Sequence, residues 1–288
     1  MYFLVVNLVN TTTWRMCSLV QLLHFILAAF FLWPSNLRAQ PRSFTIDYAH
    51  DTFLLDGRPF RYISGSMHYF RVPRAYWRDR LRKMFAAGLN AVETYIAWNY
   101  HEVQRGVYWF DGDRDVVHFV RIAQEEGLYV ILRVGPYICA EWDMGGLPGY
   151  LIELHRPLPN QTAPFLRSSH PLFLATINTW FSVLLPRLQP LLYERGGPIL
   201  LVQMENEYGS FRLCDKSYMA ELYKMLRSNL GENVIIFTTD GNTRELVECG
   251  SYLPYAYPTI DFGPCMLSFP LCLHCLMIFL VRLSYFCL

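Results

Sequence analysis

Two glutamates flank one asparagine in the segment GGPILLVQMENEYGS, residues 196–210. A carboxyl group in such a place can donate a proton to a departing alcohol. The apolar run before them predicts a strand, on which Gln203, Glu205 and Glu207 share one face for as long as the chain stays extended. Glu207 follows where the strand gives way to a loop, which favours Glu207 as a general acid. The alternative is a hydrogen-bonded polar network that closes the end of the sheet.

A second candidate region is the loop GPYICAEWDMGGLPGYL, residues 135–151, whose glycines let the backbone approach a ligand closely. Glu141 beside Trp142 offers a carboxylate for hydroxyl groups and an aromatic face for a ring. The segment ETYIAWNYHE adds Tyr95 and Trp98, either of which could line a sugar site. Each of these residues also has an ordinary interpretation, a salt bridge for Glu141 and core packing for the aromatics. His68 alone is more typical of a core histidine.

These residues follow apolar runs that alternate with amphipathic ones, which predicts βα units around a parallel sheet. No glycine-rich phosphate loop follows the first predicted strand, which argues against an open dinucleotide-binding sheet. The polar residues cluster just after strands, as at the rim of a (β/α)8 TIM barrel, so we favour the barrel. The predicted strands cover residues 62–66, 90–98, 128–135, 198–203, 233–240 and 259–263, and the helices cover 75–88, 113–127, 172–193 and 217–231.

Composition and the two ends of the chain limit the classes of function. The 288 residues are 53% hydrophobic with a net charge of +1, which describes a globular protein and argues against nucleic-acid binding. Residues 16–40 resemble a secretory signal with cleavage near Ala39, or else a signal anchor or core helix. Asn160 in NQT is then a glycosylation candidate. The apolar tail, residues 265–288, has Arg282 as its only formal charge and could be a marginal membrane anchor. Cys272 and Cys275 have metal-ligand spacing, but no second pair completes a zinc site.

The motifs together resemble one known family. GGPILLVQMENEY matches the signature of glycoside hydrolase family 35, the acid β-galactosidases and their relatives. PFRYISGSMHYFRVPRAYW, GPYICAEWDMGGLP and FTTDG also resemble this family, and the similarity extends from Phe44 to Gly263. The resemblance implies a (β/α)8 catalytic domain at the N-terminal end of a longer protein with β-sandwich domains. It also implies a lysosomal or secreted retaining exo-β-galactosidase that needs no metal or cofactor and acts on β-galactoside-terminated glycans.

The resemblance also assigns roles to single residues. Glu207 would be the acid/base, and Asn206 would hydrogen-bond the sugar 2-hydroxyl. By the same resemblance, Tyr95 and Glu141 would bind the galactose hydroxyls. Cys139 and Ala140 would contribute to the wall of the site. Cys214 and Cys249 match a family disulfide. The chain departs from the family pattern mildly, with Ala97 in place of a proline and Asp143 in place of a glutamate.

The catalytic pair is incomplete in this sequence. Retaining glycosidases use two carboxylates about 5–5.5 Å apart, one as acid/base and one as nucleophile. The family carries its nucleophile after the seventh strand, and no matching segment occurs here. We therefore expect a barrel domain over residues 41–264 without strands 7 and 8, between a leader over residues 1–40 and a non-family tail over residues 265–288. The chain would then be inactive by itself. The alternatives are a non-catalytic galactoside-binding protein and a fragment attached to a membrane through its leader or tail.

Overall fold

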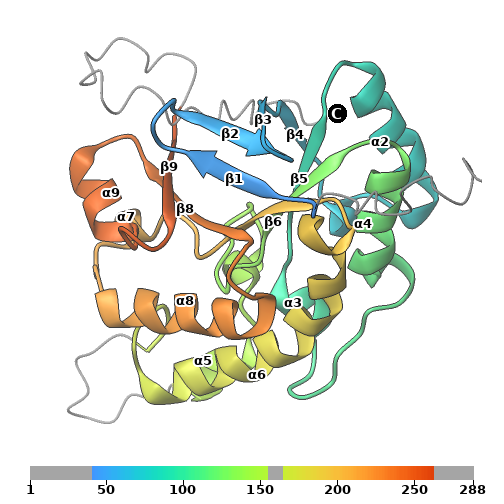
Figure 1. Ribbon diagram of the computed structural model, residues 1–288. Helices are drawn as coiled ribbons and strands as arrows, with labels where there is room; N and C mark the ends of the chain where they lie inside the picture. The colour runs from blue at the N-terminus through green and yellow to red at the C-terminus, as the bar shows by residue number, and fades with distance from the viewer. Residues whose placement is uncertain (1–40, 155–164, 263–288) are drawn as a thin grey trace, which may run out of the picture. The chain divides into compact units, whose positions relative to one another are not determined.

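The central element is a parallel sheet of six strands in the part of the chain that the computed structural model describes, residues 41–154 and 165–262 (Figure 1). Each strand pairs with the next one in the sequence, as in a (β/α)8 barrel that is still open. The predicted strands are thus confirmed in number and order. Their bounds are β4 (Ser64–Ser66), β5 (Ala91–Tyr95), β6 (Tyr129–Arg133), β7 (Ile199–Gln203), β8 (Ile235–Gly241) and β9 (Tyr257–Asp261).

Helices lie between the strands along the chain, and the four longer ones occupy the predicted positions. Asp115 and Asp215 begin two of them, each accepting a hydrogen bond from a backbone N–H of the first turn. The helix predicted over residues 172–193 ends at Leu188, and a separate 3-10 turn that contains Pro190 follows over Gln189–Leu191. The helices are α2 (Trp77–Ala86), α3 (Trp98–His101), α4 (Val116–Glu125), α5 (Tyr150–Leu154), α6 (Pro171–Leu188), α7 (Tyr208–Phe211), α8 (Lys216–Leu230) and α9 (Arg244–Gly250).

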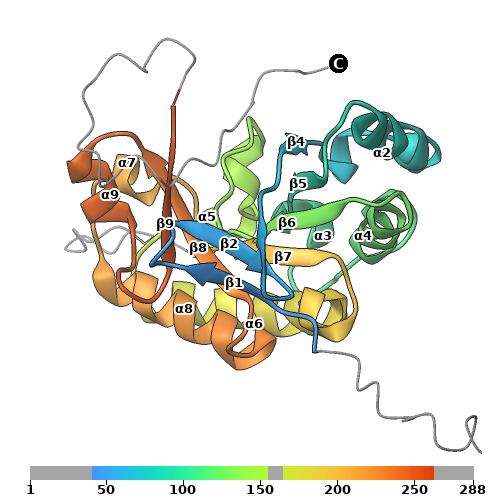
Figure 2. The same ribbon diagram turned by 45° about the horizontal axis from the view of Figure 1, so that its top comes forward.

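A small antiparallel sheet precedes the barrel strands and was not predicted from the sequence. It consists of β1 (Phe44–Asp47), β2 (Thr52–Leu55) and β3 (Arg58–Phe60). Phe53 of this sheet packs on Tyr257 at 5.8 Å between ring centroids, and Phe60 packs on Tyr129 at 5.3 Å. Tyr129 and Tyr257 are the first residues of β6 and β9, so the small sheet covers the amino end of the parallel strands (Figure 2). The opposite, carboxyl end is left for the site.

The expected disulfide is present and joins the connection after α7 to the end of α9. Cys214 and Cys249 are bonded across 35 residues of sequence. Several other predictions, namely the leader, the glycosylation site at Asn160 and the apolar tail, lie outside the described residues. Within the described residues, no helix is both long and apolar enough to cross a membrane.

We expect the double substitution of Cys214 and Cys249 by serine to lower the free energy of unfolding by roughly 3–4 kcal/mol, since the crosslink closes a loop of this length in the unfolded chain. Urea unfolding followed by tryptophan fluorescence measures this loss. Cys139→Ser is the matched control, because Cys139 is the unbonded cysteine of the described residues. Equal midpoints for the double variant and the control would contradict the prediction.

Candidate active site

The two glutamates of the opening segment do not share a face. β7 ends at Gln203, and both Glu205 (φ 59°) and Glu207 (φ 45°) then adopt left-handed backbone conformations. Two such residues within three positions turn the chain sharply, so the extended geometry on which a shared face depends ends at Gln203. The turn carries the two carboxylates into different environments.

Glu205 belongs to a buried polar network. Its carboxylate is 2.7 Å from a guanidinium nitrogen of Arg167 and accepts a hydrogen bond of 2.7 Å from the Tyr218 hydroxyl. The residue is only 2% exposed. Burial, followed by the nearby Glu205 carboxylate, raises the pKa of Tyr218 well above its ordinary value, so this hydroxyl stays a donor. The interpretation as a polar network is therefore confirmed for Glu205, whose paired carboxylate is unsuited to proton transfer.

Arg167 holds this network together, and the sequence analysis did not identify it. Its guanidinium lies 3.9 Å from the centroid of the Tyr137 ring and donates to the backbone carbonyl of Asn206 at 2.7 Å. One buried cation thus neutralises Glu205 and fixes the backbone of the next residue. No local pattern marks Arg167, which comes 38 residues before its carboxylate partner.

Asn206 is fixed by a second arginine that the sequence analysis also missed. Arg133 donates to the Asn206 side-chain oxygen, forms an ion pair of 3.0 Å with Glu93 and lies 4.2 Å from the Tyr95 ring centroid. Tyr95, Arg133 and Gln203 are register partners on β5, β6 and β7, so they form one row across the sheet. An arginine inside the apolar run LYVILRVG was the signal available in the sequence. The row connects Tyr95 to Asn206.

Glu207 is half-buried and begins the short helix α7. Its backbone N–H donates to the Thr239 carbonyl at 2.9 Å, and its carboxylate accepts from the Asn206 side-chain amide at 3.3 Å. Residues at this helix position commonly cap their own helix, but the Glu207 side chain makes no such bond. Its carboxylate is therefore available for chemistry at the carboxyl end of the sheet.

The loop after β6 presents the other expected residues in a constrained backbone. Cys139 (φ 55°), Ala140 (φ 55°) and Glu141 (φ 45°) are consecutive left-handed residues, a conformation that L-amino acids seldom adopt in series. Arg71, after β4, donates to the carbonyls of Ala140 and Glu141, the latter at 3.1 Å. Glu141 is exposed, Ala140 is buried and the Cys139 thiol is half-buried. Arg71 thus fixes the backbone that presents the Glu141 carboxylate.

The remaining candidates are two tryptophans and a histidine, which differ in burial. Trp98 is fully buried and stacks on Trp180 at 5.8 Å, so it belongs to the core. Trp142 is half-buried, and its indole N–H donates to Asn99 at 2.9 Å. His68 is half-buried with its ring 4.8 Å from that of Tyr95, which places it beside the row described above.

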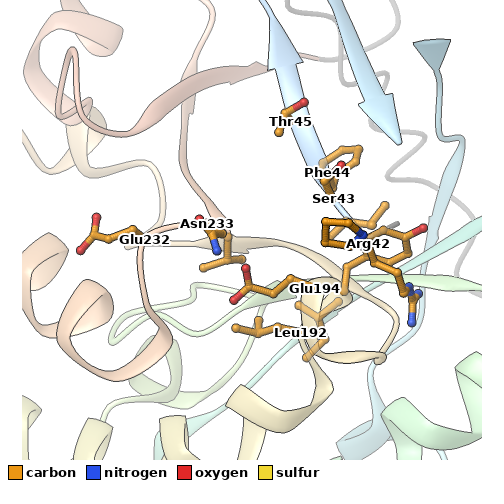
Figure 3. A pocket seen from close by; sticks show the side chains of 13 residues that line it. Arg42, Ser43, Phe44, Thr45, Leu192, Glu194, Glu232 and Asn233 are labelled. Atoms are coloured by element: carbon orange, nitrogen blue, oxygen red, sulfur yellow. The ribbon is translucent and has the colours of Figure 1, made fainter. Parts of the chain in front are cut away.

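A surface pocket of about 450 Å³ has side chains of β1 in its lining (Figure 3). Its lining includes Phe44 of β1, Ile199 at the start of β7 and Val234 just before β8. These positions mark the amino ends of the strands, whereas Glu207 follows a carboxyl end. The pocket is therefore separate from the candidate active site. Among the described residues, no group of three histidine, cysteine or acidic side chains is arranged to hold a metal ion.

One protein family and several β-galactosidases are similar in sequence to most of this chain. A family model described as Glycosyl hydrolases family 35 matches residues 52–269. A β-galactosidase of Bos taurus is 54% identical over 86% of this chain and 37% of its own length. For a β-galactosidase of Homo sapiens the values are 53%, 85% and 35%, and for a β-galactosidase-1-like protein of Mus musculus they are 53%, 79% and 34%. The chain thus spans about a third of the length of the curated relatives it matches.

Proposed function

Because this chain belongs to glycosyl hydrolase family 35, we propose that it carries the acid/base and galactose-binding part of a retaining β-galactosidase site. The observation that carries the proposal is the contrast between the two neighbouring glutamates. Glu205 is buried in an ion pair with Arg167, whereas the Glu207 carboxylate is half-buried beside the Asn206 amide. Only Glu207 of the two can reach a leaving oxygen.

In this mechanism Glu207 protonates the glycosidic oxygen as the first bond breaks and then removes a proton from the attacking water. The Asn206 amide, held by Arg133 through its oxygen, is oriented with its N–H group toward the site and would bind the sugar 2-hydroxyl. Tyr95 and Glu141 would bind further galactose hydroxyls. Cys139 and Ala140 would form the wall beside them, in the backbone conformation that Arg71 maintains.

The second carboxylate of the pair is proposed to lie beyond the six described strands. Glu205 is occupied by Arg167, and Asp240 at the end of β8 is only 1% exposed. Neither is available as a nucleophile on an anomeric carbon. We propose that the six described strands supply the acid/base of the pair and not its nucleophile. A non-catalytic galactoside-binding role is then the alternative function of the chain itself.

We expect Glu141→Ala to abolish binding of galactose, because the variant removes an exposed carboxylate that accepts hydrogen bonds from sugar hydroxyls. Binding is measured by galactose titration in NMR spectra of the chain. Glu153→Ala is the matched control, since Glu153 is an exposed glutamate on α5. Wild-type chain that fails to bind galactose, or a Glu141→Ala variant that still binds it, would refute the proposed site.

The galactose titration, combined with an assay of hydrolysis, separates the enzyme from the galactoside-binding protein. Galactose binding together with release of phenol from an aryl β-galactoside would support the complete enzyme, and binding without release would support the galactoside-binding role.

We also propose that the protein passes through the secretory pathway to the lysosome or the extracellular space. The Cys214–Cys249 disulfide supports this, because such bonds persist in oxidising compartments. A membrane attachment through the leader or tail would be tested by alkaline carbonate extraction, and release into the supernatant would exclude it.

A further inference from the structure

Asp240 is a buried carboxylate next to the site that the proposed mechanism does not use. It lies near the carboxyl end of β8, one residue after Thr239, and is 1% exposed. One of its carboxylate oxygens, Oδ1, accepts a hydrogen bond of 2.8 Å from the backbone N–H of Gly209. The other, Oδ2, has no hydrogen-bond partner among the described residues. A buried carboxylate with one unsatisfied oxygen is costly and therefore calls for a specific reason.

Gly209 is in the first turn of α7, the helix that Glu207 begins. The orphan N–H groups of such a turn are commonly satisfied by the side chain of the residue that begins the helix. Here the Glu207 side chain does not do this, and Asp240 supplies the acceptor from the neighbouring strand instead. Together with the bond from the Glu207 N–H to the Thr239 carbonyl, it attaches the turn to the end of β8.

The junction around this bond is tightly packed. A Cβ atom added to Gly209 would come within 2.0 Å of the Leu246 carbonyl oxygen, and one added to Gly250 would come within 1.8 Å of Asp240 Oδ1. Only glycine therefore fits at these two positions where α7, β8 and α9 meet. The Lys216 ammonium group further fixes the end of α9 by donating to three backbone carbonyls, those of Glu248, Cys249 and Ser251. Asp240 is therefore surrounded by closely packed backbone.

We propose that Asp240 is a positioning residue for Glu207: by holding the Gly209 amide it fixes the turn from which the Glu207 carboxylate reaches the substrate, and its protonation links that turn to pH. The inference rests on the proposed function of Glu207. Asp240 touches neither substrate nor reacting atoms, so it acts only through the turn.

The charges around Asp240 favour its protonated form. Burial raises the pKa of Asp240 to about 7, against the lowering effect of the Gly209 hydrogen bond and with the help of three nearby carboxylates, those of Glu205, Asp261 and Glu207. The Lys216 ammonium on α8 is a cation that interacts with this carboxylate. Below neutral pH, Asp240 is therefore neutral and still accepts the Gly209 bond through Oδ1. Above neutral pH, Asp240 carries a negative charge beside the turn that carries Glu207.

The direction of the effect on stability follows from linkage. The folded-state pKa of Asp240, about 7, lies above the ordinary value of 3.8, so the unfolded chain releases this proton first as the pH rises. The contribution of protonated Asp240 to the free energy of unfolding is therefore complete below about pH 4 and is lost as the pH rises through about 7. Asp240→Asn keeps an oxygen acceptor for Gly209 but cannot ionise, so it should lack this decline.

The test compares Asp240→Asn with Asp240→Ala, which also removes the acceptor. Asp215→Ala is the matched control, because Asp215 likewise caps a helix, α8, through the Tyr218 N–H. We expect the Gly209 amide to exchange with solvent several-fold faster in Asp240→Ala but at the wild-type rate in Asp240→Asn and in the control. The 13C shift of the Glu207 carboxyl, assigned through Glu207→Gln, should show a step near pH 7 in the wild type and the control, and in neither Asp240 variant.

Where turnover is measured, Asp240→Ala should lower kcat by up to roughly 100-fold with little change in KM, because displacement of a catalytic group by about 1 Å has an effect of this size. Asp240→Asn should restore kcat at acidic pH. Unchanged Gly209 exchange in Asp240→Ala, or a Glu207 step that survives in both variants, would overturn the positioning role. Failure of the wild-type chain to bind galactose, with the NMR differences intact, would refute the proposed function and leave the positioning role standing.

Discussion

Glu207→Gln is expected to lower kcat/KM roughly 10²–10⁴-fold for β-galactosides with poor leaving groups, the usual contribution of a positioned general acid. Gln has nearly the shape of Glu and keeps an oxygen that can accept the Asn206 hydrogen bond, so the turn should survive the change. The loss therefore reports the missing proton. The measurement compares phenyl β-galactoside with 2,4-dinitrophenyl β-galactoside, whose leaving group departs without protonation.

The comparison of the two substrates also provides the control. Bond cleavage with the dinitrophenyl substrate should be nearly normal in Glu207→Gln, because only the poor leaving group needs the acid. The later hydrolysis step should then be slow, since Glu207 also activates the water. Added azide, which needs no base, should restore the rate and yield β-galactosyl azide if the enzyme retains configuration. Equal losses for both substrates, without rescue by azide, would assign the acid to another residue.

Arg167→Met is expected to lower the free energy of unfolding by roughly 3–5 kcal/mol, because it removes one partner of a buried ion pair and leaves the other charge uncompensated. The side chain of Glu205 is 1% exposed and that of Arg167 is 9% exposed, so water can replace little of the lost interaction. Methionine preserves much of the apolar volume that packs against Tyr137. Urea unfolding at pH 7 measures the loss.

The matched control for this pair is the double variant Arg167→Met with Glu205→Gln. The glutamine side chain introduced by Glu205→Gln is neutral and can still accept the hydrogen bond from Tyr218, so the double variant should recover a large part of the lost stability. The hydrogen bond from Arg167 to the Asn206 carbonyl would still be missing, which keeps recovery incomplete. A double variant no more stable than Arg167→Met would show that uncompensated charge is not the cause of the loss.

The order of the sheet strands could be read from the sequence because each strand is a local apolar run. PILLVQ and NVIIFTTD became β7 and β8 almost residue for residue. The small sheet before them escaped prediction because its strands are only three or four residues long and one contains Pro59. The disulfide was expected from the family resemblance alone, and the structure confirms it. The sequence predicted which strands supply the side chains at the carboxyl end of the sheet, but it did not predict which residues these side chains contact.

The difference between Glu205 and Glu207 illustrates what the sequence leaves open. Both follow the same strand, and neither is a glycine, so nothing local predicted their left-handed backbone. The partners that separate them come from far along the chain. Arg167 is 38 residues from Glu205, Arg133 is 73 residues from Asn206, and Asp240 is 31 residues from the Gly209 amide.

The sequence by itself determined the family, the barrel strands in their order and the identity of the acidic segment, because periodicity and motif are properties of neighbouring residues. Only the tertiary structure decided that Glu205 is buried against Arg167 while Glu207 is left half-buried and available, and that Asp240 caps the turn that Glu207 begins. The physical reason is that the charge state and reach of a carboxylate depend on burial and on the groups that surround it. In this fold those groups are brought together by parallel strands whose carboxyl ends meet.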